Sequence, residues 1–310
     1  MNTLGLITGI YKQLDDKPFI PKSIMSFLRF ATRKFGNYFL PLYLRKTSSH
    51  FALSEKKRNR QIIVSFTSFP ARINYVWIIF ECMVRQTIQP DKVILYLSKE
   101  QFPSFDSLPK HLKEQTKRGL IIHLCDDDLR SHKKYHYAFR EYPDDFVITV
   151  DDDIFYEPSM IENLMKMHDE FPNDVIANKT RHISCDKNGK IGDYNTWKYT
   201  SEPGGDSKNV QIGVGGVLYQ PRLMYYDILN WGLAKKLCYN ADDLWLFAMT
   251  KLSGHIVIRS QRTSNMNLGI RLFEQNSRLS SQNVGNNMND NQINNIVNYY
   301  QETLGINPFV

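Results

Sequence analysis

The stretch at residues 146–156 reads FVITVDDDIFY. Its first five residues are those of a buried strand, and Asp151, Asp152 and Asp153 follow them directly. Adjacent carboxylates repel one another, and the end of an apolar strand solvates them poorly, so the triplet implies a positively charged partner. A second triplet, at 126–128, also follows an apolar stretch. The chain therefore presents two acidic strand ends.

Apolar strands and amphipathic helices alternate around this stretch. The expected strands cover residues 62–66, 91–97, 120–125, 146–150, 174–178 and 255–260. The expected helices cover residues 74–86, 109–118, 132–142, 158–171, 222–230 and 241–253. Because the strands are almost wholly apolar, the pattern predicts an α/β fold with a parallel sheet covered by helices on both faces. An asparagine-rich stretch, 283–298, leads into an expected last helix and is a candidate lid.

Length, composition and charge limit the class of protein. The 310 residues are 42% hydrophobic and 13% aromatic, which suits one large α/β domain or two smaller ones. Residues 1–60 hold 12 lysines and arginines against 3 acidic residues, whereas the other 250 residues hold 27 against 29. A nucleic-acid enzyme would spread basic charge around its site, so we expect no nucleic-acid partner.

The sequence also bears on the compartment. It contains no uncharged apolar run of about 18 residues and no signal-peptide pattern, so we expect neither a spanning helix nor secretion. Its four cysteines are scattered, with no CxxC pair, which is typical of reduced thiols. We therefore predict a cytoplasmic protein.

Residues 1–58 form a basic extension ahead of the main domain. Over residues 19–46, apolar side chains recur at helical spacing, with basic residues mostly on the other side. The apolar positions are Ile20, Ile24, Phe27, Leu28, Ala31 and Phe35. Two interpretations remain open. The helix lies on an anionic membrane surface, at the inner face of the cell membrane, or it packs its apolar face on the domain.

The end of the 146–150 strand is a candidate site for a hard cation. In open parallel sheets, ligands bind beyond the carboxyl ends of the strands. Strand alternation would place Asp151 and Asp153 on one side, where two carboxylates can bind Mg²⁺ or Mn²⁺ and leave positions for water and phosphate oxygens. A solvated turn or a helix cap is the alternative. For residues 126–128 we favour helix capping or a secondary nucleotide contact.

Several motifs occur in the order found in a bacterial family of glycosyltransferases with the GT-A fold. They are VSFTSFPARI (64–73), QTIQPDKVILYLS (86–98), DDLRSHKK (127–134), ITVDDDIFY (148–156), GGVLYQP (215–221) and DDLWL (242–246). The likeness runs from residue 62 to residue 260, and this chain has VLYQP where VLYPP is usual. Enzymes that it resembles transfer a sugar from a nucleotide sugar to an acceptor, commonly in capsule or lipopolysaccharide synthesis.

The resemblance implies a domain and a set of site residues. It implies a GT-A-like domain over residues 59–310, with a nucleotide-binding half at 62–178 and an acceptor-binding half at 179–310. Asp151 and Asp153 match the metal-binding DxD motif, and Asp152 between them could contact ribose or sugar. The residues that would face the nucleotide or the donor sugar are Thr67, Ser68, Pro70, Arg72, Lys133, Lys134, Gly215 and Gly216. His255 could complete the metal shell.

A late helix supplies the expected base. An inverting transferase needs a carboxylate that takes the proton of the acceptor hydroxyl. Asp242 and Asp243 open this helix, where one could cap it while the other works, and we expect Asp243 to be the base. Trp197 and Trp245 are candidate sugar-stacking faces or buried core residues.

Three functions stay open at this point. The first is a metal-dependent, inverting glycosyltransferase, with a UDP-sugar favoured as donor and a saccharide or lipid-linked acceptor. The second is a nucleotidyltransferase or metal-dependent phosphohydrolase. It is disfavoured because the first loop, TSFPARI, has neither the glycines of a phosphate loop nor an aspartate nucleophile. The third is a non-catalytic membrane-associated scaffold, against which the intact acidic motifs argue.

Overall fold

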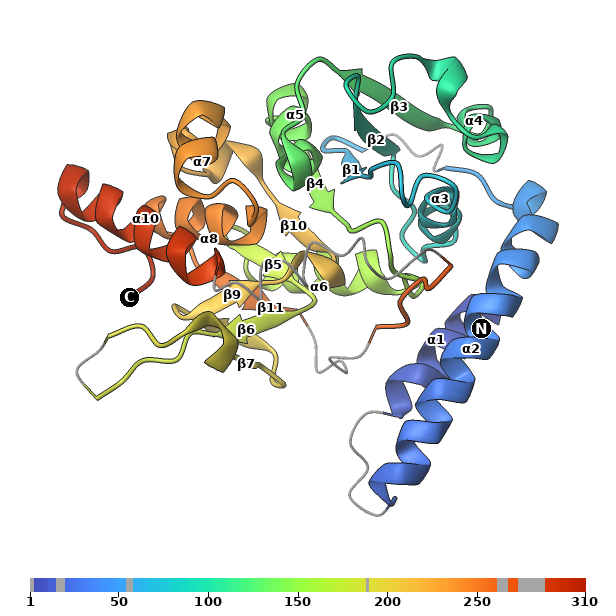
Figure 1. The fold of residues 1–310 in the computed structure, drawn as a ribbon, viewed down its shortest axis with the longest axis horizontal. Helices are drawn as coiled ribbons and strands as arrows, with labels where there is room; N and C mark the ends of the chain where they lie inside the picture. Colours follow the sequence, from blue (N-terminus) through green and yellow to red (C-terminus); the bar gives the residue numbers. More distant parts are fainter. Residues whose placement is uncertain (1–2, 15–19, 54–57, 188–189, 261–266, 273–287) are drawn as a thin grey trace.

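An eight-stranded sheet forms the centre of the computed structural model (Figure 1), which describes residues 3–14, 20–53, 58–187, 190–260, 267–272 and 288–310. The strand order is β3-β2-β1-β4-β10-β5-β11-β8. The bounds are β1 (Ile62–Thr67), β2 (Lys92–Ser98), β3 (Leu120–Cys125), β4 (Phe146–Thr149), β5 (Val175–Ala177), β8 (Gly204–Asp206), β10 (Val217–Tyr219) and β11 (Val257–Arg259). Only β10 and β8 run against the other strands of this sheet. The predicted α/β fold with a mostly parallel sheet is confirmed.

Helices cover both faces of the sheet, because successive residues of each strand point to opposite sides. Ile62 and Val64 of β1 belong to one core, and Ile63 belongs to the other. The first core includes residues of α3 (Trp77–Met83), α4 (Lys110–Thr116) and α6 (Met160–Glu170). The second core includes residues of α5 (Lys133–Glu141), α7 (Trp231–Leu237), α8 (Asp242–Leu252) and α10 (Met288–Leu304).

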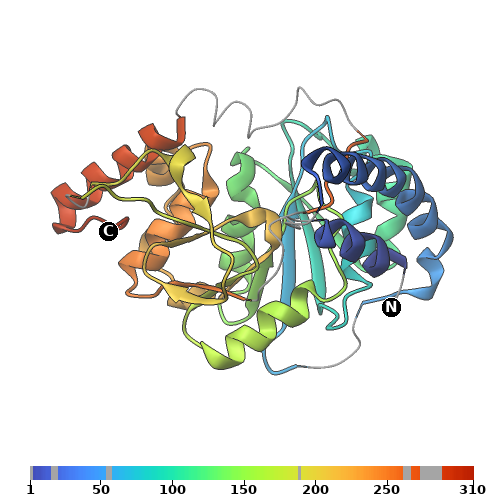
Figure 2. The same ribbon diagram turned by 90° about the horizontal axis from the view of Figure 1, so that it is seen from below.

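The N-terminal extension is a pair of helices, α1 (Thr3–Gln13) and α2 (Lys22–Lys46), which pack against each other. We call this pair the helical hairpin. Figures 1 and 2 show that it projects beyond the body of the protein and lies at the opposite end from α10. The predicted helical extension is confirmed. Within the described ranges, no helix has the length and apolar character needed to span a membrane.

A second, three-stranded antiparallel sheet lies beside the main one. It has the order β7-β6-β9, from β6 (Thr180–His182), β7 (Lys198–Tyr199) and β9 (Asn209–Gln211). The main sheet itself continues across residue 178, since β8, β10 and β11 all come from later in the chain. The glycine- and asparagine-rich region after residue 179 therefore adds strands to the main sheet and builds a small sheet of its own.

The prediction of a helix over residues 222–230 is wrong. Two short 3₁₀ turns, Pro221–Leu223 and Tyr226–Leu229, occupy this region, and the backbone between them is extended. The α-helix starts only at α7, where Asn230 caps it by accepting a hydrogen bond from the Leu233 N–H (3.1 Å). Of the asparagine-rich stretch, residues 288–298 belong to α10, and the rest lies outside the described residues.

Candidate active site

A cleft of about 720 Å³ opens where β1, β3 and β4 end. Its lining comes from the loop after β1, the start of α5, the residues after β4 and the start of α8, with one wall from the three-stranded sheet. The predicted site residues that line it are Thr67, Ser68, Arg72, Lys133, Lys134, Asp151, Asp152, Asp153, Asp242 and Asp243. These residues are scattered along the sequence, and the fold gathers them because parallel strands deliver their carboxyl ends to one edge of the sheet.

Asp152 is fixed in the floor of the cleft by the loop that follows β1. The Ser68 hydroxyl donates to its Oδ2 (2.6 Å), and the Arg72 guanidinium forms an ion pair with its Oδ1. Arg72 also lies 3.2 Å from the Asp153 carboxylate. Burial raises the pKa of Asp152, although Arg72 and Ser68 oppose that rise. The first loop thus acts as the positive partner of the acidic strand end.

The ammonium group of Lys134 joins the strand end to α8. Its Nζ lies 2.8 Å from Asp151 Oδ1 and 2.9 Å from Asp242 Oδ2, and the residue is only 4% exposed. Burial alone would lower the pKa of Lys134, but the carboxylates of Asp151, Asp242 and Asp243 raise it well above its usual value. Lys134 therefore stays charged, and it holds two acidic segments together that would otherwise repel each other.

Asp242 and Asp243 are neighbours with opposite pKa shifts. Burial favours the neutral form of both, but Lys134 lies against Asp242 and lowers the pKa of that carboxyl. For Asp243, burial and the adjacent Asp242 carboxylate together raise the pKa to about 7. Neither side chain caps α8. Two neighbouring carboxyls whose environments separate their pKa values are the arrangement from which acid–base chemistry is built.

Gly213, which was not predicted from the sequence, helps to place Asp243 in the cleft. Its backbone N–H faces both oxygens of the Asp243 carboxylate, at 3.2 and 3.1 Å. A Cβ at this position would lie 3.0 Å from Lys134 Nζ and 3.1 Å from Asp243 Oδ1, so a larger residue would press on the charged cluster. Gly213 belongs to the same GVGG motif as the predicted Gly215 and Gly216, so the sequence did carry a signal for it.

Strand alternation does not govern the triplet. β4 ends at Thr149, and a turn begins at Asp152, so the triplet is not extended chain. Asp151 pairs with Lys134, whereas Asp153 pairs with Arg72. The expectation that Asp151 and Asp153 share a side because they are two residues apart in a strand is therefore unsupported, although both line the cleft.

The donor set fits a divalent cation in a restricted way. Among the described residues, no group of three or more histidine, cysteine, aspartate or glutamate side chains is arranged to hold a metal ion. Asp151 and Asp153 are the more exposed members of the triplet, with side chains 31% and 25% exposed. Mg²⁺ commonly uses one or two carboxylates and completes its shell with water and substrate phosphate. These residues therefore suit a cation that binds together with a diphosphate.

The structure does not bring all of the predicted residues to the cleft. Pro70 lies in the turn after β1, exposed and outside the lining. The space at Gly215 is filled by Lys179, and Gly216, with φ +85°, packs on the Met160 sulfur, so both glycines serve the local backbone. His255 follows α8 and precedes the amino end of β11. Because β11 runs in the same direction as β4, His255 lies at the opposite edge of the sheet from the triplet.

Other predicted features also have clear positions. Lys133 forms an ion pair with Asp128, and the Asp128 carboxylate also accepts from the Arg130 N–H (3.0 Å), so this second triplet supports the turn into α5. Trp197 and Trp245 are buried, at 3% and 0% exposed, and they are core residues.

The wall from the three-stranded sheet carries cleft residues that no motif indicated. The Arg181 guanidinium stacks between the rings of Tyr194 and Tyr199, at 5.1 and 4.6 Å from their centroids. Asn240 and Asn289 complete the rim on this side. These residues could not be found from the sequence, because their common position depends on how β6, β7 and α10 pack.

Comparisons with known proteins give a limited picture. No family model matches the chain, and no curated protein matches it. Among solved structures, S. aureus TarS residues 1–349 in complex with UDP is 12% identical, with a TM-score of 0.45, over 66% of this chain and 59% of that one. The mannosyltransferase PcManGT from Pyrobaculum calidifontis, in complex with GDP-Man and Mn²⁺, is 10% identical, with a TM-score of 0.39, over 74% of this chain and 65% of that one.

A synthase is similar to this chain to about the same degree. The 4-diphosphocytidyl-2C-methyl-D-erythritol synthase from Anaerococcus prevotii is 12% identical, with a TM-score of 0.43, over 68% of this chain and 93% of that one. The chain thus spans less than two thirds of the TarS structure and nearly all of the synthase. At such identities, and with TM-scores below 0.5, these likenesses do not bear on what this chain binds or transforms.

Proposed function

We propose that the protein is a divalent-metal-dependent glycosyltransferase of GT-A type that moves a sugar from a nucleotide sugar to a saccharide or lipid-linked acceptor. The observation that carries the proposal is the pairing, in one cleft, of an acidic strand end with a neighbouring carboxyl whose pKa is raised to about 7. Such a pair separates the two tasks of the reaction. One part of the cleft binds the diphosphate, and the other moves the proton.

On the donor side, Asp151 and Asp153 would hold Mn²⁺ or Mg²⁺. When bound, the metal ion would neutralise the negative charge that develops on the departing diphosphate. Lys134 contacts Asp151, stays charged and favours binding of the phosphate groups. Thr67, Ser68 and Arg72 are the residues that we assign to the nucleoside side, and we favour a UDP-sugar as the donor.

On the acceptor side, Asp243 would accept the proton of the attacking hydroxyl. A base works best when its pKa lies near the operating pH, and burial beside Asp242 gives Asp243 that property. The Gly213 N–H orients the carboxylate without neutralising it. Because Asp243 would deprotonate the acceptor hydroxyl for direct attack on the donor sugar, with the nucleotide departing, we propose a single displacement with inversion at the anomeric carbon. A role in the synthesis of surface polysaccharide, such as capsule or lipopolysaccharide, completes the proposal.

The test combines binding with product analysis. Thermal unfolding of the protein is followed with UDP-, GDP- and CMP-sugars, each with and without Mn²⁺, because a ligand that binds only the folded state raises the apparent stability. We expect one base to raise the melting temperature, and more so with Mn²⁺. Turnover of that nucleotide sugar should then release the nucleoside diphosphate or, for a CMP-sugar, the monophosphate. Release of pyrophosphate from a nucleoside triphosphate and a sugar phosphate would instead identify a nucleotidyltransferase and refute the proposal.

A further inference from the structure

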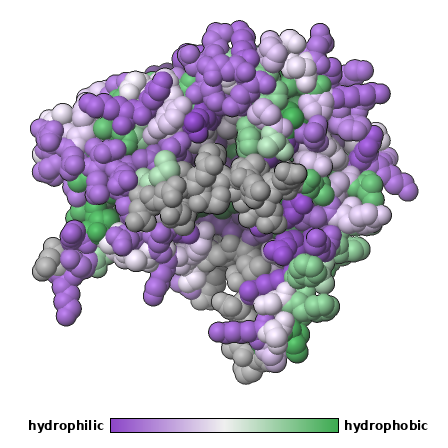
Figure 3. Space-filling model, in the orientation of Figure 1, coloured by the Kyte–Doolittle hydropathy of each residue, from purple (hydrophilic) through white to green (hydrophobic). Residues whose placement is uncertain are grey.

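Helix α2 presents a second apolar face that nothing among the described residues covers. Six large apolar side chains on it are between 36% and 75% exposed. They are Ile24, Phe27, Leu28, Phe35, Tyr38 and Leu42, and we call this surface the outer face. Their spacing is that of one side of a helix. In Figure 3, apolar side chains gather over the projecting hairpin, in the lower right of the view.

Helix α1 and the domain together cover the other side of α2. Met25, Leu40 and Leu44 are buried there, and Gly36 lies so close to Leu268 that a Cβ would come within 3.0 Å of that side chain. The inner and outer faces lie on opposite sides of the helix, because positions 25, 36, 40 and 44 are offset by about half a turn from the exposed ones. Packing on α1 and the domain therefore explains the inner face and leaves the outer face without a role.

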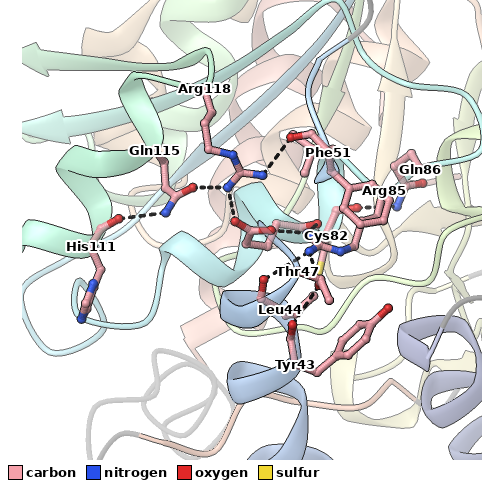
Figure 4. Close-up of polar contacts among 12 residues, drawn as sticks. Tyr43, Leu44, Thr47, Phe51, Cys82, Arg85, Gln86, His111, Gln115 and Arg118 are labelled. Atoms are coloured by element: carbon pink, nitrogen blue, oxygen red, sulfur yellow. Dashed lines mark hydrogen bonds and ion pairs between the residues drawn. The ribbon is translucent and has the colours of Figure 1, made fainter. Parts of the chain in front are cut away.

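A buried ion-pair network fixes this orientation (Figure 4). Glu81 of α3 is fully buried between the guanidinium groups of Arg85 and Arg118. Arg85 also donates to the Leu44 carbonyl (3.2 Å) and the Thr47 hydroxyl (2.9 Å) at the end of α2. Arg118 donates to the carbonyl of Phe51, just beyond α2 (3.0 Å). The outer face is thus held away from the domain.

The charge around the outer face shows what kind of partner it fits. No aspartate or glutamate occurs between residues 17 and 54. Lys34, Arg45 and Lys46 are exposed on α2 and flank the apolar side chains. An apolar stripe rimmed by cations and free of anions complements an anionic lipid surface, which offers headgroup charge above an apolar interior.

We propose that the outer face of α2 is the docking surface for an anionic lipid bilayer, on which the helix lies parallel to the membrane plane. The stripe from residue 24 to residue 42 is about 27 Å long at 1.5 Å per residue, enough for its aromatic and aliphatic side chains to enter the headgroup boundary together. This inference does not depend on the transferase activity, and its test needs no catalytic assay.

Docking would also set the orientation of the cleft. Lys12 of α1 forms an ion pair with Glu157 (2.5 Å), just after the acidic strand end. The Asn37 amide of α2 donates to the Gly269 carbonyl (3.0 Å), and the next residue, Ile270, donates its N–H to the Asp153 carbonyl (2.7 Å). The hairpin and the triplet are thus tied to the same short segment. A membrane-bound hairpin would hold the cleft at a fixed angle to the bilayer.

The test is co-sedimentation of the full chain with vesicles of phosphatidylcholine alone or of phosphatidylcholine and phosphatidylglycerol in equal parts. The variant Phe27→Gln/Phe35→Gln/Leu42→Gln should bind the mixed vesicles at least about tenfold more weakly than the wild type, because each substitution removes apolar area from the lipid contact. The matched control Tyr226→Gln/Leu304→Gln changes exposed apolar residues outside the hairpin and should bind like the wild type.

A second variant separates charge from apolar contact. Lys34→Gln/Arg45→Gln/Lys46→Gln should lose most of the preference for anionic over neutral vesicles, at about 1 kcal/mol or roughly fivefold for each basic residue near the surface. Lys235→Gln/Lys236→Gln, exposed on α7, is the matched control and should keep that preference. All of the variants should unfold like the wild type, since substitutions of exposed side chains usually change stability little.

Three results would overturn the proposal. Wild-type protein that stays in solution with both kinds of vesicle has no lipid-docking face. A triple apolar variant that sediments as the wild type does would place the lipid contact elsewhere. A wild-type dimer that the triple apolar variant converts to monomer, with no vesicle binding by either, would make the outer face an interface between two copies of this chain.

Discussion

Replacement of Asp243 by Asn tests the assignment of the base. The change removes the ionisable carboxylate and keeps an oxygen that can accept from the Gly213 N–H, so the side chain should stay in place. Loss of a general base reduces a rate by about 10²–10⁴-fold, equal to about 3–5 kcal/mol in the activation free energy. We expect turnover of the nucleotide sugar to fall within this range, while the melting temperature changes little.

The pH profile gives a second magnitude from the structure. With a pKa of about 7, Asp243 is protonated and inactive as a base in acid and becomes active as the pH rises. A base with this pKa is about one-tenth ionised at pH 6 and about nine-tenths ionised at pH 8, so the wild-type rate should rise about tenfold across that interval. The Asn variant should show no such rise. Asp242→Asn should move the rise to lower pH, because the Asp242 carboxylate is one cause of the raised pKa.

The assay measures initial rates of nucleotide release from the donor that stabilises the protein most in the presence of Mn²⁺. Asp144→Asn is the matched control, since this carboxylate is exposed and lies outside the cleft. The reasoning is refuted if Asp243→Asn keeps more than about a tenth of the wild-type rate, because loss of a general base should leave about a hundredth or less. A tenfold rise between pH 6 and pH 8 that persists in the variant would assign the titration to another group.

Two further predictions concern stability and do not depend on activity. Glu81→Gln leaves two arginines facing a neutral side chain, so the free energy of unfolding should fall by about 3–5 kcal/mol in urea titrations. The control Glu114→Gln changes an exposed carboxylate and should have little effect. Equal urea midpoints for the two variants would contradict this prediction. Burial holds the pKa of His132 at about 4, below the value of about 6.5 in unfolded chains, so its contribution to stability is complete above pH 6.5 and is lost as the pH falls towards 4. At about 1.4 kcal/mol per pKa unit, the free energy of unfolding that is lost in acid amounts to about 3 kcal/mol. Unfolding compared at pH 7 and pH 4.5 should show a smaller loss in His132→Gln than in the wild type or in the exposed control His50→Gln.

The sequence was enough to predict the fold class and the acidic and basic residues at the centre of the cleft. Apolar strands such as FVITV repeat with helices between them, and a strand that is apolar throughout can only be buried on both faces. Once the sheet is parallel, residues that follow different strands must meet at one edge. The family resemblance assigned Ser68 and Lys134 to the nucleotide, and the parallel sheet explains why they meet Asp151 in one cleft.

The pairing of the charges and the covering of the helix faces depend on tertiary packing. Lys134 lies between Asp151 and Asp242 because α5 and α8 pack on the same face of the sheet, and no local pattern encodes that distance. The raised pKa of Asp243 follows from the same packing. Helix α2 is the clearest case, because the sequence shows that it is amphipathic and basic but cannot say which apolar stripe the domain takes. Burial is a property of the assembled fold, and it is the fold that covers Leu40 and leaves Phe27 exposed.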